Sequence, residues 1–296
     1  MLPGTADIVS LHLNRFNSIG VFDSGIGGLS VLKEIRKIMP DQHLIYFGDQ
    51  IHVPYGRRSI EQVRQFSFGI TNFLLEQGAK LIVIACNAAS AASLIFLREQ
   101  FPQIPFVGME PALKPAAEKT HSGAVAVLAT QTTFQGQLYA SVMERFARDV
   151  TVFQDPCPGL VEEIEQGHFN GNKTRAILEK ALIPLLTKNI DTVVLGCTHY
   201  PHVIPLIKEI VGENVNVIDP APAVAIQTRK IYLQMNFQDT SQNKIAETWI
   251  TSSSPKEPRG AIVRQLFPYR FQICHAKWND QEDKLNLTHE KNVSFQ

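Results

Sequence analysis

Short runs of consecutive apolar residues alternate along this chain with segments in which apolar residues recur at helical spacing. The runs are rich in β-branched residues and are apolar throughout, not only at every second position. A strand that is apolar on both faces is typical of a parallel sheet covered by helices on both sides. The pattern therefore predicts an α/β protein with mainly parallel central sheets. The predicted strands are Ile19–Phe22, Leu44–Phe47, Leu81–Ala85, Phe106–Met109, Val125–Ala129, Val150–Phe153, Thr192–Leu195 and Val215–Ile218.

The segments between these runs have the spacing of amphipathic helices. From Ile60 to Leu74 the apolar residues step by three and four positions, which places them on one helical face. The segment from Ala176 to Leu186 has the same character, and Pro184 within it predicts a kink or a break.

Two of the runs end in the same way, in a cysteine followed by small and polar residues. They are "KLIVIACNAAS", residues 80–90, and "DTVVLGCTHYP", residues 191–201. The repetition suggests two similar α/β halves. Open parallel sheets bind ligands at the carboxyl ends of their strands. Two sheets that face each other would therefore direct Cys86 and Cys197 into one crevice.

A single cysteine at a strand end is most often a small buried apolar residue. Here Asn87 follows one thiol, and Thr198 and His199 follow the other. Each thiol also precedes a predicted helix N-terminus, which favours a thiolate. Histidine beside a thiol suggests nucleophilic catalysis, whereas clustered metal ligands are lacking. Cys157 and Cys274 have no chemical neighbours in the sequence, which favours structural roles.

Composition excludes several classes of protein. The chain has 296 residues with 28 basic and 28 acidic side chains. It lacks a dense basic block, so nucleic-acid binding is not suggested. Four cysteines without a C-x-x-C pair fit free thiols in a reducing cytoplasm. The N-terminus lacks the features of a signal peptide. Leu81–Leu97 contains polar residues and is too short for a membrane span, so we expect a soluble protein.

Three further motifs have ambiguous chemistry. "GVFDSGIGGLSVL", residues 20–32, lacks the Lys-Ser/Thr of a phosphate-binding loop, and its G-x-G-x-x-G pattern is incomplete. Asp23 there is a candidate base, orienting group or partner of a substrate ammonium, and with Ser24 it is equally a candidate helix N-cap. "YFGDQIHVPYG", residues 46–56, reads as a strand end and a loop. "CPGLVEEIEQG", residues 157–167, reads as a helix with solvated glutamates.

The pattern weakens at both ends of the chain. Residues 1–17 read as a loose extension. After Gln238, "ETWIT" predicts a strand and "GAIVRQLF" a short helix, while the polar stretch from Asn279 to Gln296 predicts disorder.

Taken in order, these motifs resemble the cofactor-independent aspartate/glutamate racemase superfamily, and glutamate racemases in particular, over roughly residues 18–255. The resemblance implies two pseudo-symmetric α/β domains with the active site in the cleft between them. The first would comprise residues 18–111 and 221–278, and the second residues 112–220. Residues 1–17 and 279–296 would be flexible tails.

The resemblance also implies a reaction. Racemisation removes the α-proton of glutamate from one face and returns a proton to the other, so two opposed acid/base groups are needed. A thiol with a pKa near 8.5 can serve as either after modest tuning. Cys86 would take the proton from D-glutamate and Cys197 from L-glutamate. Neither a cofactor nor a metal is implied.

The remaining site residues follow from the same resemblance. Asp23 would assist Cys86, and His199 and Glu165 would assist Cys197. One departure is Ala88, where the family usually has a threonine. The implied substrate-binding residues are Asp23, Ser24, Tyr55, Gly56, Asn87, Thr198 and His199, together with the altered position Ala88.

Three alternatives stay open. One is a racemase of aspartate or another amino acid, since pocket volume cannot be read from sequence. Another is a catalytically idle binding protein that keeps the fold. A thiol hydrolase is disfavoured, because its histidine would serve one nucleophile and not two separate thiols. The sequence leaves open a homodimer, and D-glutamate supply for peptidoglycan is the role that the resemblance implies.

Overall fold

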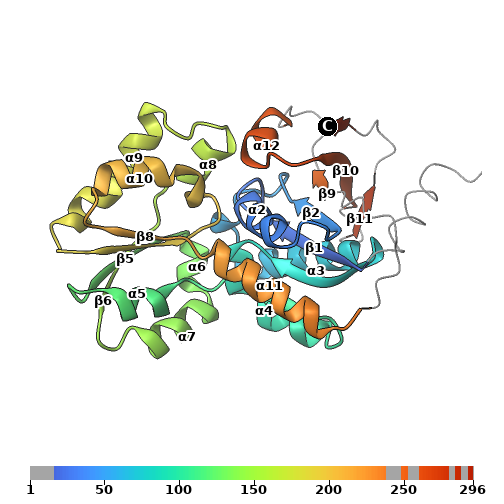
Figure 1. The fold of residues 1–296 in the computed structure, drawn as a ribbon, viewed down its shortest axis with the longest axis horizontal. Helices are drawn as coiled ribbons and strands as arrows, with labels where there is room; N and C mark the ends of the chain where they lie inside the picture. The colour runs from blue at the N-terminus through green and yellow to red at the C-terminus, as the bar shows by residue number, and fades with distance from the viewer. Residues whose placement is uncertain (1–16, 238–247, 253–259, 280–283, 288–292, 296) are drawn as a thin grey trace, which may run out of the picture.

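The computed structural model describes residues 17–237, 248–252, 260–279, 284–287 and 293–295. In this part of the chain, two separate β-sheets are flanked by helices and lie next to each other (Figure 1). The predicted α/β class is therefore confirmed.

The first sheet is built from strands near both ends of the described chain. Its strands are β1 (Ser18–Asp23), β2 (Leu44–Gly48), β3 (Ala79–Ile84), β4 (Phe106–Gly108), β9 (Thr248–Ser252), β10 (Phe271–Asn279), β11 (Lys284–Leu287) and β12 (Val293–Phe295). The order is β11-β10-β9-β2-β1-β3-β4, and β12 pairs with β10. The pairings from β10 to β4 are parallel, whereas β11 and β12 are antiparallel to β10.

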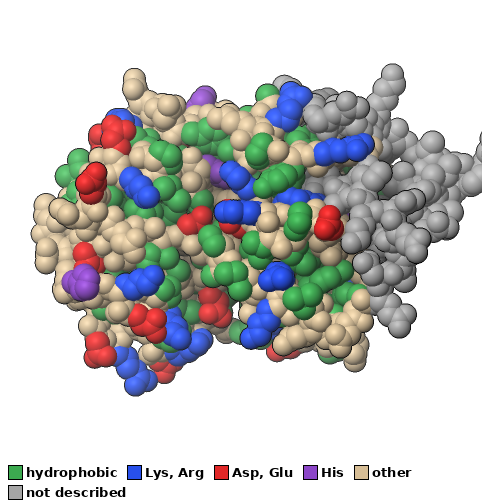
Figure 2. All heavy atoms as spheres, in the orientation of Figure 1, with side chains coloured by type: hydrophobic (Ala, Val, Ile, Leu, Met, Phe, Trp, Pro, Cys, Tyr) green, Lys and Arg blue, Asp and Glu red, His purple; other side chains and the backbone are tan. Residues whose placement is uncertain are grey.

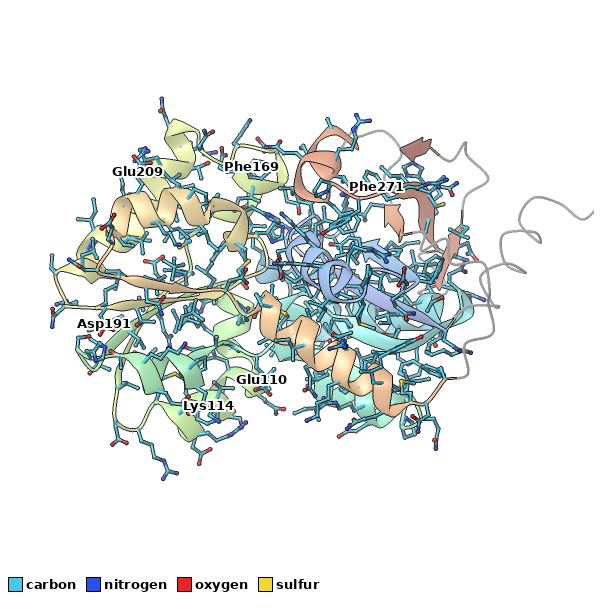
Figure 3. All side chains as sticks on the ribbon, viewed as in Figure 1. Glu110, Lys114, Phe169, Asp191, Glu209 and Phe271 are labelled. Carbon is cyan, nitrogen blue, oxygen red and sulfur yellow. The ribbon has the colours of Figure 1, made fainter. Side chains whose placement is uncertain are left out.

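The second sheet is parallel throughout and comes from the middle of the chain. Its strands are β5 (Ala124–Ala129), β6 (Thr151–Asp155), β7 (Thr192–Gly196) and β8 (Asn216–Ile218). The order is β6-β5-β7-β8. Asp191, just before β7, lies at the end of this sheet that points away from the first sheet (Figure 3). The carboxyl end of β7, which leads into Cys197, therefore points toward the first sheet.

The two sheets repeat the same topology. The order β2-β1-β3-β4 of the first corresponds strand by strand to β6-β5-β7-β8 of the second. Cys86 comes two residues after β3 and Cys197 directly after β7, so both thiols follow equivalent strands. The predicted pseudo-symmetry of the two halves is confirmed at the level of topology.

Helices cover both faces of the first sheet. One face packs on α2 (Leu29–Ile38), α11 (Ala221–Gln234) and α12 (Gly260–Leu266), and the other on α3 (Ile60–Glu76) and α4 (Asn87–Gln100). All six residues of β1 are buried as a result. This two-sided burial is the reason for the uninterrupted apolar runs.

The second sheet is covered in the same way. One face packs on α8 (Leu160–Glu165), α9 (Asn172–Leu186) and α10 (Ile204–Val211), and the other on α5 (Leu113–Lys119) and α7 (Gln137–Phe146). The short elements are η1 (Tyr55–Arg57), α6 (Gln131–Gln135) and η2 (Tyr200–Val203). No described helix has the length and apolar character needed to cross a membrane.

Every strand predicted up to residue 218 is present, with bounds that differ by a few residues. The helix predicted from Ile60 is α3, and its start is fixed by a capping box between Ser59 and Gln62. Pro184 does not end α9, which continues to Leu186. Pro184 lies in the last turn, where it lacks the N–H that would bond to the Lys180 carbonyl, and the helix ends two residues later.

The prediction of disorder from Asn279 onward is wrong for residues 284–287 and 293–295. Residues 284–287 form β11 on the edge of the first sheet, where Leu285 is only 2% exposed and joins the core. The burial of Leu285 and the pairing of β11 with β10 stabilise this polar segment.

The return of the chain to the first sheet supports the predicted domain division. α11 packs on α2, and β9 and β10 extend the first sheet. We propose that residues 18–111 and 221–278 form one domain and residues 112–220 the other, with β11 and β12 added to the first. Residues 1–16, part of the predicted N-terminal tail, lie outside the described residues.

Candidate active site

The glycine-rich loop between β1 and α2 is one of the places where the two domains meet. Asp23 ends β1 and is 0% exposed, and its Oδ2 accepts a hydrogen bond of 3.0 Å from the Gly25 amide. Tyr46 on β2 donates from its hydroxyl to the Gly25 carbonyl at 2.6 Å. The N-cap of α2 is Gly28, without a side-chain cap, so the interpretation of Asp23 and Ser24 as a capping pair is wrong.

Glycine is needed in this loop because side chains of the second domain lie against it. A Cβ at Gly25 would overlap the Glu165 carboxylate, and one at Gly27 would overlap the His199 ring. Any other residue would separate the loop from these groups.

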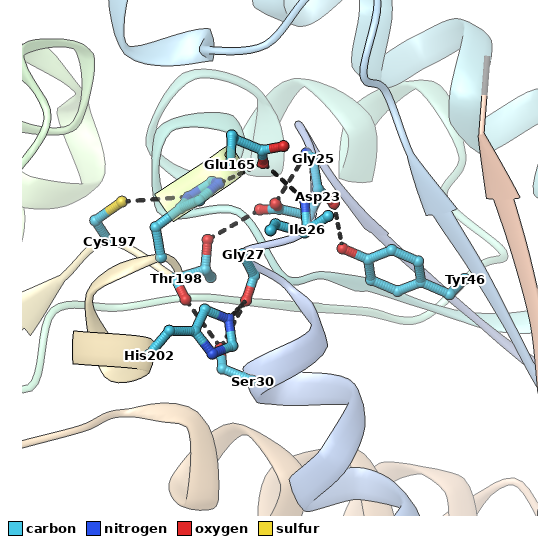
Figure 4. Close-up of polar contacts among 11 residues, drawn as sticks. Asp23, Gly25, Ile26, Gly27, Ser30, Tyr46, Glu165, Cys197, Thr198 and His202 are labelled. Carbon is cyan, nitrogen blue, oxygen red and sulfur yellow. Dashed lines mark hydrogen bonds and ion pairs between the residues drawn. The ribbon is translucent and has the colours of Figure 1, made fainter. Parts of the chain in front are cut away.

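Hydrogen bonds across the domain boundary fix this approach (Figure 4). Thr198 Oγ1 donates to Asp23 Oδ1 at 3.0 Å, and the Ile26 amide donates to Glu165 Oε1 at 2.8 Å. Ser30 Oγ donates to the Thr198 carbonyl at 3.1 Å. Residues far apart in the sequence therefore form one polar network.

Cys197 is the first member of a hydrogen-bonded series. Its Sγ lies 3.7 Å from Nδ1 of His199, and Nε2 of His199 lies 2.7 Å from Glu165 Oε1. Burial opposes protonation of His199, but the hydrogen bonds to Cys197 and Glu165 and their negative charges raise its pKa well above the usual value. The imidazole is thus stabilised as a cation between a thiol and a carboxylate.

Cys86 has a different environment. It is the N-cap of α4, and its Sγ accepts a hydrogen bond of 3.4 Å from the Ala89 amide. Burial and the negative charge of Asp23 raise the pKa of Cys86 well above its usual value, although the Ala89 amide acts in the opposite direction. A charge on Cys197 also raises the pKa of Cys86, so the two thiols are electrostatic neighbours.

The predicted helix N-terminus is present after Cys86 but not directly after Cys197. Cys197 is followed by Thr198 and His199, and then by the short 3₁₀ helix η2. For Cys86, the N-terminus of α4 lowers the pKa of the thiol less than burial raises it. The two thiols therefore differ in electrostatics despite their equivalent places in the sheets.

The predicted substrate-binding residues are nearly all buried. Ser24 is 3% exposed, Tyr55 1%, Asn87 3% and Thr198 2%. Among the described residues, neither polar atom of the Asn87 side chain has a hydrogen-bond partner. A buried, unpaired amide is costly, which favours a ligand as its partner. Gly56 packs against Thr130 of the second domain.

Ala88 is 4% exposed and packs in the core cluster that contains Tyr55 and Cys86. Ser90 is the nearest hydroxyl in the sequence, but it is already engaged. Its Oγ donates to the Ile84 carbonyl at 3.1 Å and accepts from the Met109 amide at 2.8 Å. Ser90 therefore does not replace the hydroxyl missing at Ala88.

The interpretation of the glutamates in α8 as solvated is wrong for two of them. Glu165 is 6% exposed and contacts the glycine-rich loop and His199. Glu163 is 4% exposed and pairs with Lys173 at 2.6 Å and His168 at 3.0 Å. Glu165 is buried against the first domain, whereas Glu163 is buried beside His168 and Lys173 of its own domain.

Sequence reasoning missed His202 and the position of Cys157. Nε2 of His202 lies 3.3 Å from the Gly27 carbonyl, and burial together with the charge of His199 lowers the pKa of His202 to about 4. A neutral ring donates this hydrogen bond and so supports the loop. Burial and Asp155 raise the pKa of Cys157 most. A charge on Cys197 raises this pKa further, which indicates that the two thiols lie near each other. In the sequence, the feature that indicated His202 was its position three residues after His199.

Within the described residues, no three His, Cys, Asp or Glu side chains are grouped so as to hold a metal ion. On the face shown in Figure 2, basic and acidic side chains are interspersed over both domains. The candidate site brings together two thiols, their acid/base neighbours and a set of buried hydrogen-bonding groups.

Two α/β domains of the same topology each place a buried thiol after an equivalent strand. The family "Asp/Glu/Hydantoin racemase" matches residues 19–228. The chain belongs to this family, and it is an amino-acid racemase, an isomerase.

Several glutamate racemases are similar to this chain over most of its length. A glutamate racemase of Pseudomonas aeruginosa is 50% identical over 240 residues, which cover 81% of this chain and 90% of the relative. One of Roseiflexus is 49% identical over 251 residues, covering 84% and 92%. The crystal structure of glutamate racemase isoform RacE1 from Bacillus anthracis has a TM-score of 0.76 at 31% identity and covers 87% of this chain and 96% of its own. Escherichia coli glutamate racemase in complex with L-glutamate and an activator, UDP-MurNAc-Ala, has a TM-score of 0.72 at 32% identity, covering 85% and 92%.

Proposed function

We propose that this protein interconverts L- and D-glutamate without a cofactor, by proton transfer between the substrate α-carbon and two cysteines. The observation that carries the proposal is that Cys86 and Cys197 follow equivalent strands of the two sheets and are electrostatic neighbours in one buried site. The substrate follows from the relatives, which are glutamate racemases, and from related structures with D-glutamate and L-glutamate bound.

Each direction of the reaction uses one thiolate and one thiol. With L-glutamate, the Cys197 thiolate removes the α-proton, the electron pair stays on the α-carbon, and the Cys86 thiol donates its proton to the opposite face. With D-glutamate the roles are reversed. Charge is conserved, because one thiolate is consumed as the other forms.

The neighbouring groups support this division of roles. An imidazolium at His199 attracts a thiolate at Cys197, and Glu165 holds the ring in place. The raised pKa of Cys86, due to burial and Asp23, favours the thiol there. In this division of roles Cys197 is the base for L-glutamate, and Asp23 assists Cys86 in the reverse direction.

The buried polar groups suit an amino acid that carries several charges. In this proposal Ser24, Tyr55, Gly56, Asn87, Thr198 and His199 bind the substrate. The unpaired amide of Asn87 is the group whose burial most needs such a ligand. D-glutamate formed here would supply peptidoglycan synthesis in the cytoplasm.

The test is incubation of the purified protein with L- or D-glutamate in heavy water. We expect circular dichroism to decay to zero from either enantiomer, and proton NMR to show deuterium at the α-carbon. Racemisation that is lost on dialysis and restored only by pyridoxal phosphate would contradict the cofactor-independent mechanism. Aspartate assayed in parallel tests the substrate, since a higher kcat/KM for aspartate would contradict the glutamate assignment.

A further inference from the structure

Asp49 is a carboxylate that lies beneath the turn carrying Tyr55. It directly follows β2 and is 0% exposed. Its Oδ2 lies 2.7 Å from the Tyr55 hydroxyl, which donates to it, and 2.8 Å from Nδ1 of His52. Its Oδ1 accepts a hydrogen bond of 2.9 Å from Nε1 of Trp278. Three side chains thus satisfy one buried carboxylate.

Trp278 belongs to β10, far along the chain from the other members of this group. It lies beyond residue 228, where the match to the racemase family ends. Its indole also meets the His52 ring edge-on, with the ring centroids 5.5 Å apart. His52 in turn stacks on Phe66 of α3, with centroids 3.9 Å apart and planes 10° from parallel. Strand β10 therefore supports the loop that follows β2.

The backbone of Asp49 is also linked to Asp23, next to the reacting groups. The Asp49 amide donates to the Asp23 carbonyl at 3.0 Å, which joins the ends of β2 and β1. Burial, followed by the charge and hydrogen bond of Asp49, raises the pKa of Tyr55 well above its usual value, and charges on Cys86 and Asp23 act in the same direction. Tyr55 is therefore a neutral phenol, directed toward Asp49 and close to the first thiol.

We infer that Asp49 and Trp278 are positioning residues for the Tyr55–Gly56 turn, and that β10 completes the substrate site from outside the matched family region. The inference rests on the proposed function, in which Tyr55 and Gly56 bind glutamate. The hydrogen bonds of Asp49 hold the Tyr55 ring and hence the backbone of the turn in one orientation.

The expected effect is on binding and not on proton transfer. Without the indole N–H, Oδ1 of Asp49 is left buried without this donor, and the carboxylate shifts to recover one. Tyr55 moves with it, because its hydroxyl is bonded to the same group. The thiols and their partners His199 and Glu165 lie outside this group, so KM should rise while kcat stays unchanged.

The experiment is steady-state kinetics of Trp278→Phe with both enantiomers of glutamate. Phenylalanine keeps an aromatic ring against His52 but removes the donor. We expect KM to rise about 3- to 10-fold with kcat within about twofold of wild type, which is the range for one lost hydrogen bond. Asp49→Asn, which leaves the indole in place, should raise KM at least as much. Adding Trp278→Phe to it should bring little further change, because both act through one contact.

Tyr139→Phe is the matched control. It removes a hydrogen bond of 3.0 Å from Gln154 to a buried aromatic hydroxyl on α7, in the core of the second domain. Its kinetics should equal those of wild type, even if its melting temperature falls.

An unchanged KM in folded Trp278→Phe, or a lower kcat at unchanged KM, overturns the inference. Asp49→Asn decides in the same way if Trp278→Phe does not fold. An inactive wild-type protein would overturn the proposed function, and the inference with it, whereas active wild type with unaffected variants overturns the inference alone.

Discussion

At the scale of single residues, the two thiols have equivalent positions and unequal surroundings. Cys86 lies beside Asp23, whereas Cys197 lies 3.7 Å from Nδ1 of His199. If each thiol is the acid or base for one face of the substrate, neither can replace the other.

We therefore expect Cys86→Ala and Cys197→Ala each to lower the rate of racemisation by at least about 1000-fold in both directions, the scale of general acid–base catalysis. Polarimetry on each variant measures this. Cys274→Ala is the control, since Cys274 is a buried thiol of β10 whose pKa burial raises to about 12. Retention of most activity in Cys86→Ala would disprove the two-thiol mechanism.

Ala88 allows a test of the missing hydroxyl. Because Ser90 is engaged with Ile84 and Met109, we expect Ala88→Thr to lower KM for glutamate a few-fold at unchanged kcat. Ala88→Val adds the same volume without a hydroxyl and should not lower KM. Equal effects of the two substitutions would mean that volume, and not hydrogen bonding, governs this position.

His43 makes stability depend on pH. Burial, together with the charge of Arg36, lowers the pKa of His43 to about 4, and Nδ1 lies 2.8 Å from Ser18 Oγ. The unfolded chain takes up this proton near pH 6.5, whereas the folded protein takes it up only near pH 4. The free energy of unfolding should therefore fall as pH decreases between these values, by about 3 kcal/mol at most.

Urea unfolding between pH 7 and pH 4 measures this effect. His43→Asn removes the titrating ring, so the loss of stability over this range should be smaller in the variant than in wild type. His202, whose pKa is also about 4, contributes to the slope that remains in the variant. Parallel curves for wild type and variant would contradict the assignment.

At the scale of secondary-structure elements, the loop between β1 and α2 is the most constrained connection in the site. It carries Asp23 at one end, and its backbone contacts Glu165 and His202. Its conformation therefore sets the distance between the two domains at the site.

We expect Gly27→Ala to lower kcat roughly 100-fold, because a methyl group there would overlap the His199 ring and misplace it. Gly171→Ala is the control, since a Cβ at Gly171 would lie 3.9 Å from its nearest neighbour. Circular dichroism should show both variants folded. Wild-type kcat in Gly27→Ala would mean that the loop and His199 are not in firm contact.

At the scale of the whole molecule, the two domains enclose the site. Cys86 is 5% exposed and Cys197 6%, and hydrogen bonds between the domains join the loop, Thr198 and Glu165. We expect a substrate to reach these buried thiols by a movement of the domains apart.

Alkylation should report this motion. We expect iodoacetamide to modify Cys86 and Cys197 much more slowly than the same residues in unfolded protein, and saturating D-glutamate to slow it further. Mass spectrometry of tryptic peptides measures each site separately. Alkylation of the folded protein at the rate of a free thiol would contradict a closed site.

The sequence alone determined the strands up to residue 218, the α/β class and the two cysteine-bearing strand ends. These features are local: a strand buried on both faces must be apolar throughout, and helical spacing marks one face. The ordered motifs, through their resemblance to a known family, also indicated the pairing of Cys86 with Cys197.

The tertiary structure decided what depends on partners distant in the chain. It determined that Glu165 is buried and Glu162 less so, that Asp23 is not a helix cap, and that Ser90 is engaged elsewhere. It also brought Trp278 to Asp49. A polar side chain has the same sequence signature whether it is solvated or buried with a partner, because the partner that offsets its desolvation is supplied only when the sheets and helices pack.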